Sequence, residues 1–309
     1  MDRRKFNELC RAMVLLGLAL IAAFSPDAYL PMLARAFMVP GAALFAGLAV
    51  IATLGRRWWI AQSATAGCVL MALQVPSPSA LPLGAVNGPG FRVFHMNVLR
   101  PNTAFHEVIA QALASDADVI SVQEVGTEWA LVLSRDLHSC YPYAHIEPRS
   151  NCYGIALFSK IPFTGVRTIT LQGTPFIEAL LVVSDRKVRL LAVHATSPTS
   201  YDHFRRRNEQ LCGLGEYLAG QDTPTIVVGD LNTVPWDRAF RRFCARTGLR
   251  STTPTFQRTW PAIGPFALIP LDHLLVSPGL ASVSLRTVEV PGSDHRGLLA
   301  DLRIIADAC

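Results

Sequence analysis

Charged residues are scarce in this sequence: they make up 17% of its 309 residues, whereas hydrophobic residues make up 50%. A soluble enzyme of this length usually carries about a quarter charged residues. The mean hydropathy of +0.31 is correspondingly high, and the apolar surplus is concentrated before residue 80. This uneven distribution predicts an N-terminal part that contacts lipid, followed by a more ordinary globular part.

Several patterns that would define a class are missing. The seven cysteines contain no CxxC pair, so a zinc site is not predicted. The sequence also has no internal repeat at a fixed period, so a repeat architecture is not predicted. Cys140 and Cys152 flank residues 141–151, which are predicted to form a strand and the turn that reverses the chain after it. They could form a disulfide if this part lies outside the cytoplasm, or they could remain two unpaired small side chains.

A basic surplus is missing from the C-terminal part. The formal net charge of the chain is +5, but residues 1–84 hold seven Lys or Arg against three Asp or Glu. Residues 85–309 are therefore close to neutral, with a net charge of +1. Non-specific binding of nucleic acid usually needs a strongly basic surface, which this composition does not predict.

Three charge-free runs precede residue 80, at 12–24, 36–54 and 58–75. The second is long enough to cross a bilayer, which takes about 20 residues, and the third opens with the interfacial pair Trp58-Trp59. The first could be a cleaved signal peptide, but no small-residue cleavage site follows it and further apolar runs do. We therefore predict three membrane-spanning helices, with two as the alternative.

The charges beside these runs predict the orientation. Basic residues cluster before the first run and again at Arg56-Arg57, between the second and third runs. The positive-inside rule places both clusters in the cytoplasm. Three spans put everything after residue 76 outside the cytoplasm, whereas two spans reverse this. The predicted location is the plasma (inner) membrane, in several passes, with the C-terminal domain extracytoplasmic.

The predicted organisation has three parts. Residues 1–76 form a membrane anchor, residues 77–90 form a linker rich in Pro, Gly and Ser, and residues 91–309 form one domain with a single large core. Within the domain we predict strands at 91–98, 118–125, 153–159, 163–171, 176–184, 187–194, 225–229, 272–276, 283–290 and 297–304, and helices at 105–115, 127–138, 203–219 and 236–247. Hairpins mixed with crossover helices predict an α/β (α+β) fold of mixed sheets with helices outside.

Polar residues stand at the ends of these strands. In "TIVVGDLNTVPW" (225–236), Asp230 and Asn232 lie on the same side of the chain at the carboxyl end of a buried strand. A turn would explain them equally well, because turns favour Asp, Asn and Gly. Similar interruptions occur at other predicted strand edges: Asn97, Gln123-Glu124, His194, Asp272-His273 and Ser293-Asp294-His295. Each could be a turn or cap by itself, but the set together is harder to explain in that way.

The order and spacing of this set resemble the endonuclease/exonuclease/phosphatase superfamily, also called the deoxyribonuclease-I-like fold. The resemblance spans residues 91–304 and is carried by Asn97, "QE" at 123–124, "YGIALFSK" at 153–160, His194, "GDLN" at 229–232, "LDH" at 271–273 and "SDH" at 293–295. It implies a four-layer α/β/β/α sandwich of two mixed sheets, with the site at the sheet edges. With its N-terminal helices, the chain resembles the bacterial membrane-anchored branch.

The resemblance implies a metal site. Glu124 would be the principal ligand, with Asn97 beside it and Asp294 within reach. Because these side chains offer oxygen atoms, the ion would be Mg²⁺ or Mn²⁺ and not zinc.

The resemblance also implies catalytic roles. Asp230 would orient or deprotonate the attacking water, and Asn232 and His194 would contact the phosphate. His295, oriented by Asp272, would stabilise the transition state or transfer a proton. The division of base and acid between Asp230 and the His295–Asp272 pair stays open at this stage.

These roles predict a membrane-anchored, metal-dependent phosphoesterase or phosphodiesterase that acts by attack of an activated water. Its substrate would be a phospholipid or sphingomyelin-like head group, or a nucleic acid. The alternatives are an endonuclease acting on nucleic acid and a catalytically silent, membrane-anchored binding module on the same fold. No obligate protein partner is predicted.

Overall fold

The computed structural model describes residues 2–76, 88–251 and 257–305. These residues form two compact units, one that holds the N-terminal helices and a larger one that holds the sheets. The linker predicted at 77–90 lies almost entirely outside the described residues.

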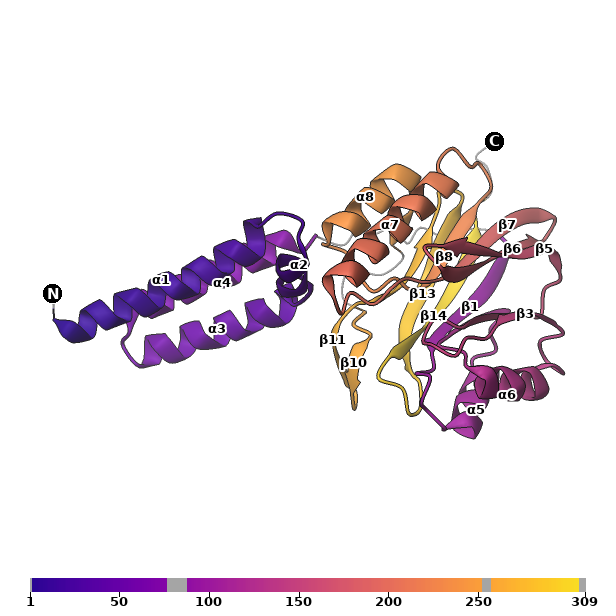
Figure 1. Cartoon of the computed structure of the whole chain (residues 1–309), viewed down its shortest axis with the longest axis horizontal. Helices are drawn as coiled ribbons and strands as arrows, with labels where there is room; N and C mark the ends of the chain where they lie inside the picture. The colour runs from indigo at the N-terminus through magenta and orange to yellow at the C-terminus, as the bar shows by residue number, and fades with distance from the viewer. Residues whose placement is uncertain (1, 77–87, 252–256, 306–309) are drawn as a thin grey trace. The chain divides into compact units, whose positions relative to one another are not determined.

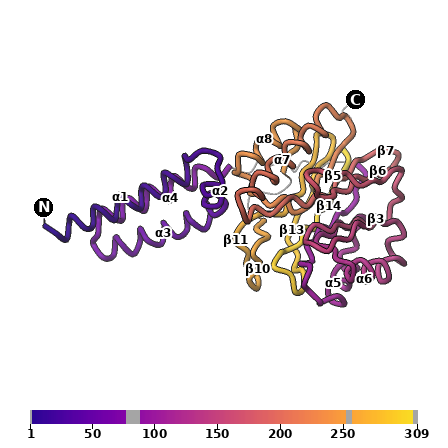
Figure 2. Tube along the Cα trace, viewed as in Figure 1, coloured from indigo at the N-terminus to yellow at the C-terminus, as the bar shows by residue number. Residues whose placement is uncertain are grey.

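The N-terminal residues of the first unit form four helices (Figure 2): α1 (Arg3–Phe24), α2 (Tyr29–Ala36), α3 (Met38–Leu54) and α4 (Trp58–Gln74). Helix α4 packs against both α1 and α3. Gly67 permits this close packing, because a Cβ atom there would lie 2.3 Å from the ring of Phe45 and 3.2 Å from Cβ of Ala19. Small residues at helix contacts are typical of helices that pack in a lipid environment.

Large apolar side chains point outward from these helices. Leu54, Leu73 and Leu44 are 80%, 75% and 72% exposed. A helix in a water-soluble bundle usually turns one apolar stripe inward and keeps the opposite face polar. The exposed leucines of α3 and α4 depart from that pattern.

One described helix, α1, is long and apolar enough to cross a membrane, while α2 and α3 qualify only as a pair bent by 66°. Helices α3 and α4 have 17 residues each, or about 26 Å, which is short of the roughly 30 Å hydrocarbon core. The prediction of three spans is therefore not supported: the described residues offer one span, or two if the bent pair counts. An apolar N-terminal helix is also typical of a signal sequence.

Two six-stranded sheets, both mixed, form the centre of the larger unit. The first has the order β13-β14-β1-β2-β4-β3 and consists of β1 (Gly90–Asn97), β2 (Val119–Gln123), β3 (Tyr143–Glu147), β4 (Ile155–Ser159), β13 (Leu280–Glu289) and β14 (Arg296–Ile304). The second has the order β5-β6-β7-β8-β12-β9 and consists of β5 (Phe163–Leu171), β6 (Thr174–Val183), β7 (Arg186–His194), β8 (Thr225–Asp230), β9 (Arg250–Ser251) and β12 (Asp272–Val276). A separate hairpin consists of β10 (Trp260–Ile263) and β11 (Phe266–Ile269).

Helices cover the outer faces of both sheets (Figure 1). Helices α5 (Phe105–Ala114) and α6 (Thr127–Leu137) pack on the first sheet, and α7 (Tyr201–Leu218) and α8 (Arg238–Thr247) pack on the second. An apolar cluster fills the space between the sheets. The layers are therefore helix, sheet, sheet and helix, and the predicted fold of two mixed sheets between helices is confirmed.

Each sheet contains one parallel strand pair, β1–β2 and β7–β8, whose strands are connected through α5 and α7. The register places Asn97 beside Gln123, and His194 beside Asp230, at the carboxyl ends. Ligands of open α/β sheets bind at this end of the strands. Gln123 joins the two pairs, because its Nε2 donates to the backbone oxygen of Val193 at 2.6 Å and its Oε1 accepts from the N–H of Asp230 at 2.8 Å.

The disulfide considered between Cys140 and Cys152 is not formed, and both are free thiols. Strand β3 runs between them and pairs along its whole length with β4. Its five extended residues span about 17 Å. A disulfide needs Cα atoms within about 7 Å, so this strand keeps the two cysteines too far apart.

Candidate active site

Asp230 lies at the centre of a buried polar cluster, where the carboxyl ends of both parallel strand pairs meet. It is only 1% exposed. Its Oδ2 lies 3.7 Å from Nε2 of His194, 3.7 Å from Nε2 of His295 and 3.4 Å from Nδ2 of Asn97. The strand order thus brings side chains from both sheets around one carboxylate.

Glu124 and Asn97 extend the cluster on the side of the first sheet. Nδ2 of Asn97 donates to Oε1 of Glu124 at 3.1 Å, and the backbone N–H of Arg100 donates to Oε2 at 2.9 Å. Glu124 has a φ of 64°, in the left-handed region that costs a non-glycine residue about 1–3 kcal/mol. The end of β2 is therefore held in a strained conformation that directs the carboxylate towards Asn97.

Asn232 follows Asp230 in a turn. Its φ is 49°, and its backbone N–H donates to Oδ1 of Asp230 at 2.9 Å. Its side-chain Nδ2 donates to the backbone oxygen of Ala195 at 3.0 Å. The two explanations of the "GDLN" motif are therefore compatible, because a turn is present and it places both side chains beside the cluster.

Asp272 joins two histidines. Its Oδ2 accepts a hydrogen bond from Nδ1 of His295 at 2.8 Å, which is the pairing expected from the sequence. Its Oδ1 accepts a hydrogen bond from Nε2 of His95 at 2.7 Å. We did not predict His95 as a site residue. The sequence feature that could have identified it is its position two residues before Asn97, which puts both side chains on one face of the strand.

His194 lies against an aromatic ring. Its ring centroid is 5.5 Å from that of Tyr153, a residue of the "YGIALFSK" motif that we did not predict as part of the site. In the part of the chain that the structure describes, Nδ1 of His194 is buried without a hydrogen-bond partner. The Tyr153 ring therefore packs beside the imidazole.

Asp294 is bonded to the β10–β11 hairpin. Its Oδ2 accepts from Nε1 of Trp260 at 2.9 Å, and its backbone oxygen accepts from the N–H of Ala262 at 2.7 Å. These bonds direct its carboxylate to the hairpin, so its expected reach to a metal ion stays a prediction.

Burial controls the protonation of two groups in the cluster. Burial, together with the nearby charge of Asp272, raises the pKa of Asp230 to about 8. Burial, together with the nearby charge of His295, lowers the pKa of His194 to about 3. At neutral pH His194 is therefore a neutral imidazole, and Asp230 is close to its point of titration.

The His295–Asp272 pair behaves differently. Burial would lower the pKa of His295, but the charges of Asp272 and Asp230 outweigh it and raise the pKa to about 10. Burial would raise the pKa of Asp272, but the charge of His295 and the hydrogen bonds from both imidazoles hold it below its usual range. The pair is therefore an imidazolium and a carboxylate at neutral pH.

Two overlapping sets of side chains could hold a metal ion. The atoms offered by Asp230, Asp272 and His295 all lie within 4.8 Å of one another, although both oxygens of Asp272 already accept imidazole N–H groups. Glu124, Asn97 and Asp230 form the other set, linked through the Asn97 amide. Carboxylate oxygens suit a hard divalent ion, so the carboxylates present fit one. In Asn97 the atom that could join them is Oδ1, which accepts the N–H of Leu99 at 3.0 Å.

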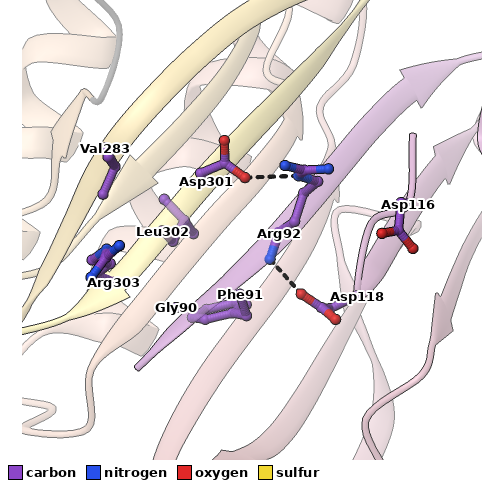
Figure 3. A pocket seen from close by; sticks show the side chains of 9 residues that line it. All are labelled: Gly90, Phe91, Arg92, Asp116, Asp118, Val283, Asp301, Leu302 and Arg303. Atoms are coloured by element: carbon purple, nitrogen blue, oxygen red, sulfur yellow. Dashed lines mark hydrogen bonds and ion pairs between the residues drawn. The ribbon is translucent and has the colours of Figure 1, made fainter. Parts of the chain in front are cut away.

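A cavity of about 430 Å³ lies elsewhere, at the amino end of β1 (Figure 3). Nε of Arg92 pairs with Oδ1 of Asp301 at 2.7 Å, and its backbone N–H donates to Asp118 at 2.6 Å. These charges largely satisfy one another. The cavity is separate from the cluster around Asp230, which lies at the carboxyl end of the strand.

Helices outside two mixed sheets, with buried carboxylates and imidazoles at the carboxyl ends of both parallel strand pairs, are an arrangement that suits a hydrolase of phosphate esters. Residues 92–295 match the model of the Endonuclease/Exonuclease/phosphatase family. The match covers more than half of the chain, and the chain belongs to this family. The family resemblance inferred from the motifs is thereby confirmed.

Solved structures agree with this assignment. The chain is similar to the endonuclease/exonuclease/phosphatase from Beutenbergia cavernae DSM 12333, with a TM-score of 0.58 and 19% identity over 70% of this chain and 72% of that one. It is similar to sphingomyelinase C from Streptomyces griseocarneus, with a TM-score of 0.54 and 18% identity over 69% and 99% of the two chains. It is also similar to D. rerio TDP2 complexed with single strand DNA product, with a TM-score of 0.55 and 17% identity over 69% and 99%. At these identities the likeness shows the fold alone. No curated protein matches the chain in sequence.

Proposed function

We propose that this chain is a membrane-anchored phosphodiesterase that depends on a divalent metal ion. One observation carries the proposal: Asp230 lies between two buried imidazoles, 3.7 Å from each, with Asn97 and Glu124 alongside. A proton acceptor, a positively charged proton donor and an oxygen-rich metal position within one cluster are the groups that hydrolysis of a phosphate ester needs.

Asp230 acts as the base towards the attacking water. Burial raises the pKa of Asp230 above the ordinary value near 4, and a carboxyl group with a raised pKa is a stronger base towards water once it has lost its proton. Asn232, fixed by its bonds to Asp230 and Ala195, and the neutral His194 contact phosphate oxygens.

His295 supplies positive charge and a proton. Because its Nδ1 is bonded to Asp272, its Nε2 faces Asp230 and the space beside it. An imidazolium there stabilises negative charge on the phosphoryl group and donates its Nε2 proton to the leaving oxygen. Asp272 fixes the tautomer of His295, as a carboxylate does in a catalytic triad.

Glu124 and Asn97 would hold Mg²⁺ or Mn²⁺ beside Asp230. When bound, such an ion offsets the charge that develops on the phosphate oxygens. Asp294 would offer the ion its Oδ1, which is buried without a hydrogen-bond partner within the described residues, while its Oδ2 stays bonded to Trp260.

Residues 1–76 would tether the domain at 91–309 to the plasma (inner) membrane through the linker at 77–90. The apolar helix α1 and the outward-facing leucines support an anchor, and with it the membrane-anchored branch of the family. From a cytoplasmic N-terminus, one span and three spans place the catalytic domain on the same, extracytoplasmic side.

A phosphodiester of a membrane lipid is the substrate class that we favour. A tether raises the local concentration of such a substrate, and the net charge of +1 on residues 85–309 does not favour nucleic acid. The fold is shared with a sphingomyelinase and with a protein solved with single-stranded DNA, so an endonuclease stays the second candidate.

Hydrolysis of bis(p-nitrophenyl) phosphate by the full chain in detergent, with and without Mg²⁺ or Mn²⁺, tests the proposal. Glu124→Gln removes a charged ligand and should lower metal-dependent turnover by about 100-fold or more. Glu216→Gln is the matched control, since Glu216 pairs with Arg246 on the surface. Unchanged turnover of Glu124→Gln at limiting metal would remove Glu124 from the site.

Natural substrates separate the candidates. Release of head groups from phospholipid vesicles supports the lipid, and cleavage of plasmid DNA supports the endonuclease. Binding of either without turnover of any diester would indicate a silent binding module.

A further inference from the structure

His95 is a buried histidine that the proposed chemistry does not use. It is 0% exposed and lies in β1, in the first sheet. Its Nε2 lies 2.7 Å from Oδ1 of Asp272, a residue of the second sheet, whose Oδ2 is bonded to Nδ1 of His295 at 2.8 Å. Asp272 therefore accepts one imidazole on each oxygen.

This hydrogen bond fixes the tautomer of His95. An ionised carboxylate only accepts hydrogen bonds, so Nε2 of His95 carries the proton. Among the described residues, Nδ1 of His95 is buried and has no hydrogen-bond partner. A neutral imidazole with its proton on Nε2 satisfies both observations.

Stability alone does not account for a histidine at this position. Phe91 and Val93, which precede His95 on the same face of β1, belong to the apolar core between the sheets. A buried polar atom without a partner costs about 1–3 kcal/mol. The compensating contact is the bond to Asp272, so any function of His95 acts through that carboxylate.

We propose that His95 is a positioning residue for the hydrolytic reaction, an inference that rests on the proposed function. Its bond to Oδ1 prevents the Asp272 carboxylate from rotating, so Oδ2 stays on Nδ1 of His295. His295 in turn keeps Nε2 directed at Asp230. Without His95, the carboxylate is free to turn away and His295 loses its fixed orientation.

Two substitutions at His95 distinguish the effect of the hydrogen bond from the effect of the ring volume. His95→Phe keeps the ring volume and removes the donor, whereas His95→Gln keeps an N–H donor at the same number of bonds from Cβ. His95→Phe should lower kcat for bis(p-nitrophenyl) phosphate by about 10- to 100-fold, as typical for residues that orient a reactive group, with little change in KM. His95→Gln should recover most of that loss.

Ser121 provides the matched control. It lies directly beside His95 in the β1–β2 register, it is buried, and its hydroxyl has no partner within the described ranges. Ser121→Ala should leave kcat near that of the wild type. In an Asp272→Ala background, His95→Phe should cause no further loss of kcat. The proposal is overturned if the double variant loses as much kcat as the two single losses combined. It is also overturned if Ser121→Ala loses as much kcat as His95→Phe.

A spectroscopic measurement separates this inference from the proposed function. In the full chain labelled in its histidine nitrogens, the two imidazole N–H groups bonded to Asp272 each give a resonance. His95→Phe should remove one and shift that of His295, whereas an unchanged His295 resonance overturns the positioning role. A shifted resonance in a protein that hydrolyses no phosphodiester would sustain the role of His95 in orienting His295 and reject the proposed function.

Discussion

Glu124, Asn232 and Leu99 have φ angles of 64°, 49° and 59°, all in the left-handed region. Each stands just after a strand that leads into the site. Such a conformation costs about 1–3 kcal/mol per residue and persists only where the surroundings determine it. The backbone N–H of Leu99 donates to Asn97, and that of Asn232 donates to Asp230. These hydrogen bonds hold both residues in their conformations. At these three positions the strain lies where side-chain direction matters for the proposed chemistry, although other non-glycine residues away from the site, such as Asp116 and Asp185, also have positive φ.

The protonation of Asp230 and His295 predicts a bell-shaped pH profile. Asp230 must be deprotonated to act as the base, so activity falls as the pH drops through its pKa of about 8. A bound cation lowers this pKa, so the acid limb lies at or below that value. His295 must be protonated to act as the donor, so activity falls above about 10. The measurement is kcat/KM for a soluble diester from about pH 5 to pH 11.

Asp272→Asn provides the control for this profile. It removes the charge that most strongly raises the pKa of His295 and that also raises the pKa of Asp230, so both limbs should move to lower pH. Activity that keeps rising past pH 10 in the wild type would exclude His295 as the proton donor.

Most of the proposed site residues could be predicted because strand ends and the alternation of side chains are local properties of a sequence. His95 could not be linked to Asp272 in this way, since their contact joins the two sheets and depends on how the sheets pack. The bond between Asp294 and Trp260 depends on a hairpin that we did not predict. The sequence alone therefore did not predict contacts between elements that are distant along the chain.

At the scale of elements, the central strands were predictable because they are buried on both faces, as in β2 and β8, and so form continuous apolar runs. Strands β9, β10 and β11 were not predicted, and β3 was predicted only as part of the segment between Cys140 and Cys152. They have two to five residues each and are partly exposed, so their apolar patterns are too short and too weak to be recognised.

Gly229 is the position in β8 where a side chain cannot be accommodated. Its φ is 147°, and a Cβ atom there would lie 1.8 Å from the backbone oxygen of Val193 and 2.3 Å from Nε2 of Gln123. Gly229→Ala should lower the free energy of unfolding by about 3 kcal/mol or more, because backbone atoms must shift to relieve the clash. It should also break the bonds by which Gln123 joins the two strand pairs. Denaturant unfolding measures the first effect.

Gly165 in β5 is the matched control. A Cβ atom there would meet only Cδ1 of Leu180, at 3.6 Å, which is an ordinary contact. Gly165→Ala should therefore change stability by less than about 1 kcal/mol. If Gly229→Ala were as stable as Gly165→Ala, the close approach of β7, β8 and Gln123 would not be a requirement of the fold.

At the scale of the whole molecule, composition alone distinguished an apolar N-terminal part from a nearly neutral remainder. It did not reveal how that apolar part is divided. The run 36–54 is one helix, α3, apart from its first two residues, but the short helix α2 that precedes it, and the bend at Phe37 that separates them, were not predicted. Hydropathy measures how apolar a segment is, whereas the number of spans also depends on where the helices break.

Retention in the membrane is the last prediction. If α1 spans the bilayer, the full chain should stay in the membrane pellet after alkaline carbonate extraction, because an inserted apolar helix is held effectively irreversibly. A fragment that begins at Gly88 should be soluble and should still hydrolyse a soluble diester, since the larger unit contains its own apolar clusters between and outside its sheets. Release of the full chain by carbonate would show that its helices are not inserted.

A signal sequence predicts a different outcome, because cleavage would remove α1 and the intact mass of the purified protein would be lower by that segment. If α1 is retained, a reporter that is active only outside the cytoplasm, fused after residue 309, determines the side of the domain. An active reporter fits α1 as a single span from a cytoplasmic N-terminus. A silent reporter would mean that the bent pair α2–α3 crosses as a second span, which would put Asp230 and its neighbours in the cytoplasm. The lipid substrate would then have to be one exposed on the inner leaflet.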